Sequence, residues 1–254
     1  MEKEDKASVT SLLQDMEKLK ELLETYHFKD HNRIELTDLE SAVNTIKANA
    51  RTKKKKKITF STGNEGITFH SLANGMSPNP GILEGKIELT LNLKYEYDCE
   101  KADLKEILNG YELDLRIVGT EKNPHGHYSK HYFEWLQDVP SPKKKTDAKY
   151  KYIHPHYHFH AGGTFMKSKA PGSLVQLSSP RLPHPPMDIV LAVNFIICNF
   201  FSTQEAKFVQ EMKILDDEDY KKLVSRAARR LYTPYIEEIR SDVTNSEFMP
   251  LFTT

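Results

Sequence analysis

The sequence ILEGKIELTLNLKYEY, residues 82–97, decides the fold class, because apolar and polar side chains alternate along most of its length. A period of two is typical of a β-strand with one buried and one solvent-facing side. The segment YELDLRIV at 111–118 repeats the alternation, and HYFEWLQD at 131–138 continues it. These segments therefore predict strands of an antiparallel sheet.

Further strands are predicted on the C-terminal side of these three. After a loop rich in proline and lysine at 139–149, the segments 150–161 and 174–178 again read as strands. They complete a predicted sheet of about five or six strands.

The N-terminal region has a helical pattern instead. Between residues 8 and 26 the apolar side chains recur at three- and four-residue steps, which predicts an amphipathic helix. The sequence TDLE at 37–40 is a capping box and predicts the start of a second helix. The two helices read as a hairpin, followed by the lysine run RTKKKKK at 51–57.

The C-terminal third is predicted to be helical. Residues 187–201 are apolar nearly all round, which indicates a buried helix lying across the sheet. The sequence STQE at 202–205 is another capping box. A last helix begins near Asp217; its basic residues, Arg230 among them, are predicted to face away from its apolar side, and Pro234 is predicted to bend or end it.

The predicted fold class is therefore α+β: an N-terminal helical hairpin, a mainly antiparallel β-sheet, and C-terminal helices packed on one sheet face. The predicted divisions are a hairpin at 1–50, a Lys-rich linker at 51–57 and an α+β domain at 58–254. Within that domain the sheet occupies 58–180 and the helices 185–240.

Composition narrows the functional classes. The chain has 254 residues with 36 Lys and Arg against 36 Asp and Glu, so its formal net charge is zero. It lacks the basic excess of a protein that coats nucleic acid, although a local basic patch is compatible with this charge. The charged amino terminus has no apolar signal core, and the longest apolar run, 189–201, is too short to cross a bilayer. We therefore expect a cytoplasmic protein with no membrane partner.

Histidine is concentrated in one part of the chain. Eight of the 11 histidines fall between residues 125 and 184. In YIHPHYHFHAGG four histidines alternate with other residues, so a strand sends them all to one face. These four are His154, His156, His158 and His160. The sequence NPHGHY at 123–128 adds a second His-x-His pair, His125 and His127.

The first interpretation of this cluster is a metal site. Neutral imidazole is the commonest metal-binding side chain, and two histidines one residue apart on a strand reach one Zn²⁺, Mn²⁺ or Fe²⁺ ion. Asp188 and the 125/127 pair are alternative sources of a third donor. The predicted metal ligands are His156, His158, His160 and His184.

The segment LSSPRLPHPPMD at 177–188 predicts an anion site beside that metal. A strand ends there, and a proline-broken loop carrying Arg181 leads to a helix N-terminus, the kind of position that binds anions. Arg181 would orient a phosphate or carboxylate through its planar guanidinium group. The alternative is a rigid turn whose arginine pairs with an internal acid. Together with the histidines, the segment favours a metal-dependent hydrolase of a phosphodiester or nucleotide.

The string HYHFHAG at 156–162 resembles the His-φ-His-φ-His-φ-φ signature of histidine-triad nucleotide hydrolases, in which φ is apolar. The resemblance implies that His158 is a catalytic nucleophile toward an α-phosphate, with a histidine on either side. The chain departs from the signature because glycine takes the last apolar position and about 90 residues follow the motif.

A longer stretch resembles a family of uncharacterised bacterial proteins. The resemblance spans about 150–235 and rests on the segments HPHYHFHAGG and SPRLPHPPMD. Some members of that family lie beside mobile-element and antiviral defence genes. The resemblance therefore implies a bacterial cytoplasmic protein and favours a role in defence, without implying an activity.

Two other interpretations do not need catalysis. The histidine row could be structural, with imidazoles packed against cross-strand aromatic side chains. Alternatively, the protein is a non-enzymatic interaction or regulatory component of a multi-protein complex, which binds a protein partner through its N-terminal helices. The lysine run at 51–57 is either a solvated linker or a contact for a nucleic-acid backbone or nucleotide.

Overall fold

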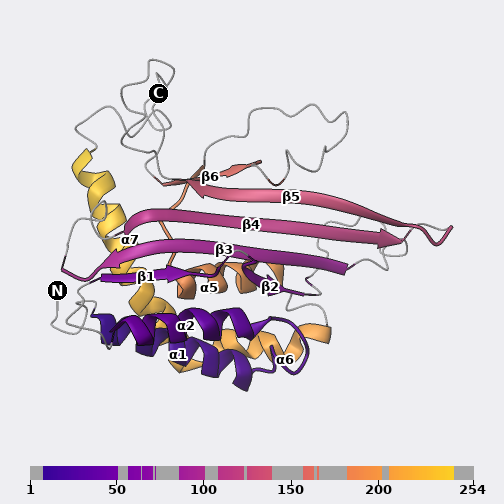
Figure 1. Cartoon of the computed structure of the whole chain (residues 1–254), viewed down its shortest axis with the longest axis horizontal. Helices are drawn as coiled ribbons and strands as arrows, with labels where there is room; N and C mark the ends of the chain where they lie inside the picture. The colour runs from indigo at the N-terminus through magenta and orange to yellow at the C-terminus, as the bar shows by residue number, and fades with distance from the viewer. Residues whose placement is uncertain are drawn as a thin grey trace, which may run out of the picture.

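The computed structural model describes residues 8–50, 57–63, 65–70, 72, 86–100, 108–122, 125–138, 157–162, 165, 182–201 and 206–242. These residues form an α+β fold in which helices from both ends of the chain pack with one antiparallel sheet (Figure 1). The fold class predicted from the alternating segments is therefore confirmed.

Seven strands form the described sheet, in the order β1-β3-β4-β5-β6-β7, and β2 also pairs with β3. All the pairs are antiparallel. The three long strands in the middle are those predicted from alternation, each extended or shortened by a few residues. The strands are β1 (Lys57–Ser61), β2 (Ile67–Phe69), β3 (Lys86–Asp98), β4 (Leu108–Lys122), β5 (Tyr128–Asp138), β6 (His158–Ala161) and β7 (Leu182–Pro183).

The two faces of the sheet differ because alternate residues point to opposite sides. On one face Leu91 of β3 lies opposite Leu115 of β4, and both are buried. This face meets the helices, since Phe159 of β6 stacks on Phe195 of α5 (Ile189–Phe200) with ring centroids 5.5 Å apart. We call it the helix face. The opposite face carries polar positions such as Asn92, which lies opposite Asp114.

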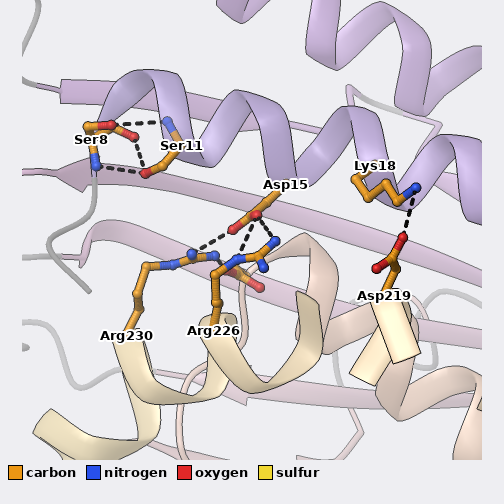
Figure 2. A network of polar contacts seen from close by, with 8 residues as sticks. Ser8, Ser11, Asp15, Lys18, Asp219, Arg226 and Arg230 are labelled. Atoms are coloured by element: carbon orange, nitrogen blue, oxygen red, sulfur yellow. Dashed lines mark hydrogen bonds and ion pairs between the residues drawn. The ribbon is translucent and has the colours of Figure 1, made fainter. Parts of the chain in front are cut away.

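The N-terminal hairpin consists of α1 (Val9–Thr25) and α2 (Leu36–Ala50). Ser8 and Ser11 form a capping box at the start of α1 (Figure 2). The capping box predicted at 37–40 does not start α2, because the helix already begins at Leu36. The reason is tertiary: Ile34 forms a β-bridge with Phe69, so the chain leaves the sheet and turns into the helix directly after it.

The C-terminal helices are α5, α6 (Val209–Met212) and α7 (Glu218–Asp242), with 3₁₀ turns on either side of α6. Seven residues of α5 are buried, as expected for a core helix. Pro234 lies inside α7, which continues to Asp242, so the proline does not end the helix. The capping box predicted at 202–205 falls outside the described residues. None of the described helices combines the length and apolar content needed to cross a membrane.

A buried ionic network joins the two ends of the chain. Asp15 of α1 accepts hydrogen bonds from Arg226 at 2.7 Å and from Arg230 at 2.6 Å, both on α7 (Figure 2). Arg230 also contacts the carboxylate of Asp188 at 3.4 Å. The prediction that Arg230 faces away from the apolar side was wrong, because these two buried carboxylates hold it in the interior at 9% exposure.

Candidate functional site

The two described histidines of the predicted row lie side by side on β6. Antiparallel pairing places His160 opposite Leu136 and His158 opposite Asp138 of β5. Both imidazoles therefore point to the face opposite the helix face, and their ring centroids are 5.6 Å apart. His158 is buried at 3% exposure.

His184 lies on the helix face instead. Its ring contacts Phe159 at 4.8 Å and Phe195 at 5.7 Å between centroids. Its Nδ1 donates a hydrogen bond to the carbonyl of Pro185 at 2.7 Å, which leaves the lone pair on Nε2. Burial lowers the pKa of His184, partly opposed by that hydrogen bond. The structure therefore does not bring His184 together with the histidines of β6.

Asp188, the alternative donor, is also occupied elsewhere. Its side chain caps α5 by accepting a hydrogen bond from the Leu191 amide at 3.0 Å, and it contacts Arg230. Burial raises the pKa of Asp188, while the charge of Arg230 and the cap hydrogen bond lower it. Its carboxylate is thus part of the helix packing and not of the histidine face.

A pair of carboxyl groups lies on the same face as the β6 histidines. The register places Asp114 of β4 opposite Leu136, and Arg116 opposite Glu134 of β5. Arg116 Nε lies 2.6 Å from Asp114 Oδ2. Burial raises the pKa of Asp114 to about 6; the charge and hydrogen bonding of Glu134 raise it as well, and Arg116 opposes the rise. Glu134 itself is only 2% exposed.

These groups surround one point of the sheet. Asp114 and His160 lie opposite the same residue, Leu136, from the two neighbouring strands, and Glu134 is two positions along β5 from it. Residues two apart on a strand share a face, so the carboxyl pair and the imidazole pair lie on the same face, with the backbones of Asp114 and His160 about 10 Å apart across β5. We call Asp114, Glu134, His158 and His160 the histidine–carboxylate face.

This arrangement can move protons. A carboxyl group with a pKa of about 6, as in Asp114, is populated in both protonation states close to neutral pH and can both give and take a proton. Buried polar atoms normally form hydrogen bonds, yet Asp114 Oδ1 and Asn92 Nδ2 are buried and have no partner within the described part of the chain. A polar ligand or a water molecule would satisfy both atoms.

The predicted metal ligands are only partly brought together. His158 and His160 share a face, whereas His184 does not. His154, His156 and Arg181 lie outside the described residues, and the exposed pair His125 and His127 lies at the β4–β5 turn. Within the ranges given above, no group of three or more His, Cys, Asp or Glu side chains is arranged to hold a metal ion.

Comparison of the chain with protein-family models, with curated proteins and with solved structures found no match. Function is therefore inferred from the chemistry of the described residues.

Sequence reasoning missed the carboxyl pair. Asp114 and Glu134 stand at polar positions of alternating strands, where a charged residue normally faces solvent. The available signal was that Asp114 stands on the face opposite Leu113 and Leu115, and Glu134 on the face opposite Phe133 and Trp135, so pairing of the two strands would put two acids on one face. Recognising it requires the order and register of the strands.

Proposed function

We propose that the protein is a hydrolase that acts on a phosphodiester or nucleotide at the histidine–carboxylate face. The observation that carries the proposal is the placement of two imidazoles and two carboxyl groups on one face around Leu136. General acid–base catalysis needs groups of this kind, with pKa values near the working pH. The resemblance of residues 150–235 to a bacterial family found beside defence genes adds antiviral defence as the proposed setting.

Each group has a proposed role. His158 or His160 attacks phosphorus or takes a proton from the attacking water, as imidazole does in both roles. Asp114, whose pKa is raised to about 6, supplies a proton to the leaving oxygen, and Glu134 lies beside it. Arg116 neutralises part of the charge of this pair. Arg181 retains its proposed role of orienting the anionic substrate.

A divalent ion, Zn²⁺, Mn²⁺ or Fe²⁺, is a separate part of the proposal. His158 and His160 offer two nitrogen donors on one face, and the strand alternation predicts His156 on that face as a third. Such an ion would supply an activated water at neutral pH. The proton transfers assigned to the carboxyl pair do not depend on it.

The test is hydrolysis of bis(p-nitrophenyl) phosphate and of a dinucleotide by the purified full chain, with and without added Zn²⁺, Mn²⁺ or Fe²⁺. The variant carrying His158→Ala and His160→Ala should lose at least about 100-fold in kcat. The matched control is His131→Ala, because His131 is exposed and lies opposite Gly119 on the other side of the sheet. Equal turnover in the double variant and the control, or none in the wild type, would refute the proposed activity.

Metal content is measured on the same proteins. A metal site at the histidine–carboxylate face requires near-stoichiometric metal in the wild type and its loss in the double variant. Substoichiometric metal in the wild type, or metal retained by the double variant, would refute the metal site. The acid–base roles would then be tested by the hydrolysis assay alone.

A second candidate is an interaction component that uses the N-terminal helices. The apolar stripe of α1 is buried within the chain, so a partner would contact the outer groove between α1 and α2. That groove is mainly charged and is lined by Glu17, Lys20, Glu21, Glu24, Glu40, Val43, Asn44 and Lys47. A stoichiometric protein partner that is lost on Glu21→Lys with Glu24→Lys would support this role. A chain that elutes as a monomer and binds neither protein nor nucleic acid would argue against it.

A further inference from the structure

A row of aromatic and basic side chains leads along β5 to the histidine–carboxylate face. Tyr128, Lys130 and Tyr132 are separated by two positions each from one another and from Glu134, so all four point to the same side of the sheet. Tyr128 is 67% exposed, Lys130 is exposed and Tyr132 is partly exposed. The β4–β5 hairpin that carries Tyr128 reaches beyond the other strands at one end of the sheet (Figure 1).

Two more side chains continue this row toward the site. Phe165 packs edge-on against Tyr132, with ring centroids 5.7 Å apart. The guanidinium carbon of Arg116 lies 5.4 Å from the centroid of the Phe165 ring. Arg116 in turn contacts Asp114 of the histidine–carboxylate face. We call Tyr128, Lys130, Tyr132, Phe165 and Arg116 the aromatic–basic strip.

We infer that the aromatic–basic strip binds single-stranded nucleic acid and delivers one of its phosphodiesters to His158 and His160. The inference rests on the proposed function and names the substrate class of that site. It also supplies the interleaving of aromatic and basic residues that the lysine run at 51–57 lacks.

The composition of the strip favours this ligand. Bases stack on aromatic side chains whatever their sequence, and lysine or arginine between the rings pairs with phosphates. A sheet that has helices on one face and aromatic side chains on the other is also how RNA-recognition domains stack two or three bases. With a rise of about 3.4 Å per residue, Tyr128 and Tyr132 are about 14 Å apart along the strand, and His160, opposite Leu136, lies a similar distance further on.

A duplex fits the strip less well. Its bases are stacked on one another and are not available to Tyr128 or Tyr132, so only the phosphate contacts of Lys130 and Arg116 would remain. A protein partner would be expected to bury a contiguous apolar patch, whereas here a cation separates the two tyrosines along β5. We therefore expect the single strand to bind more tightly than the duplex of the same sequence.

The experiment measures fluorescence anisotropy of fluorescein-labelled 12-nucleotide single strands, DNA and RNA of mixed sequence, with the full chain. Tyr128→Ala should weaken the Kd about 5- to 150-fold through the loss of one stacked base. The matched control is Phe133→Ala, because Phe133 is an exposed aromatic residue of the same strand on the opposite face. Lys130→Ala should reduce the slope of log Kd against log salt by about one.

Several outcomes would overturn the inference. The first is a wild type that binds neither oligonucleotide. The second is an equal loss of affinity in Tyr128→Ala and Phe133→Ala, and the third is a duplex that binds as tightly as the single strand. Circular dichroism of each variant identifies any loss of affinity that comes from unfolding. If a tyrosine variant unfolds, the salt slope of Lys130→Ala decides, because an unchanged slope would contradict a phosphate contact at the strip.

Failure of the proposed function gives a different result. The variant with His158→Ala and His160→Ala should bind the single strand within about 3-fold of the wild type while losing hydrolysis, because stacking and phosphate contacts lie outside those residues. Tight binding by the strip without hydrolysis in the wild type would refute the hydrolase proposal and leave the nucleic-acid site in place.

Discussion

Replacing Arg230 with methionine should lower the free energy of unfolding by about 3–5 kcal/mol. The guanidinium group lies 2.6 Å from Asp15 and 3.4 Å from Asp188, and both carboxylates have side chains no more than 5% exposed. Asp15 keeps its second partner, Arg226, at 2.7 Å. Asp188 has no other basic partner among the ion pairs of the described residues, so its carboxyl group would be buried without a cation and must either stay charged at a high cost or keep a proton.

The matched control is Arg226→Met. The Arg226 side chain is 41% exposed, and its loss leaves Asp15 paired with Arg230, so the expected cost is about 0–1 kcal/mol. Adding Asp15→Asn and Asp188→Asn to Arg230→Met should recover much of the stability, because no buried charge is then left unpaired. Both arginine variants remove one positive charge, so the difference between their free energies of unfolding reports the effect of burying that charge.

The assay is urea unfolding followed by far-UV circular dichroism and by the fluorescence of Trp135, the single tryptophan of the chain. Burial already raises the pKa of Asp188, and loss of Arg230 removes the charge that opposes this. The folded variant therefore holds this proton to higher pH than the unfolded chain, and its stability should fall as pH rises. A loss in Arg230→Met within about 1 kcal/mol of that in Arg226→Met would refute the reasoning.

Three more changes test the sheet. Because the pKa of Asp114 is raised from 3.8 to about 6, the folded state holds its proton longer, and wild-type stability should fall by up to about 3 kcal/mol as pH rises through that interval. Asp114→Asn should remove this decline in urea unfolding; parallel curves for the two proteins would contradict it. Gly66→Ala should lower the free energy of unfolding by about 2–4 kcal/mol, since φ is +78° and a Cβ would meet a backbone oxygen at 2.7 Å. Gly63→Ala, with no such contact, should lower it by about 1 kcal/mol, and equal losses in the two variants would contradict the prediction. Tyr111→Phe should cost about 1–3 kcal/mol in thermal unfolding, because the Met187 amide donates to its hydroxyl at 3.0 Å; an unchanged Tm would show that water replaces this bond.

Local pattern was sufficient for much of the fold. Alternation located β3 and β4, and the apolar run located α5, because burial on one or all sides leaves a direct trace in the sequence. The position of Arg230 could not be found in this way. The pattern of its own helix groups it with other basic residues and predicts an exposed side chain. Its burial depends on Asp15, which is 215 residues away in the sequence.

The candidate site shows the same division. That His158 and His160 share a face followed from the period of a strand. The position of His184 did not follow from its own segment. Leu182 pairs with Phe159 on the helix face, and His184 is two residues further along, so its imidazole lies on the helix face as well. Asp114 and Glu134 become neighbours only through the register of β4 with β5, which no segment of the sequence contains by itself.

The contacts between Asp15 and α7 also set a time order for folding during synthesis. Arg230 follows Asp15 by 215 residues, and at 5–20 residues per second its synthesis takes about 10–40 s longer. For that interval α1 exists without the helix against which its buried aspartate packs. The nascent chain therefore carries an amphipathic hairpin with an uncompensated acidic group on its inner side until Arg226 and Arg230 have been synthesised, and the side of α1 that packs on α7 stays uncovered for that interval.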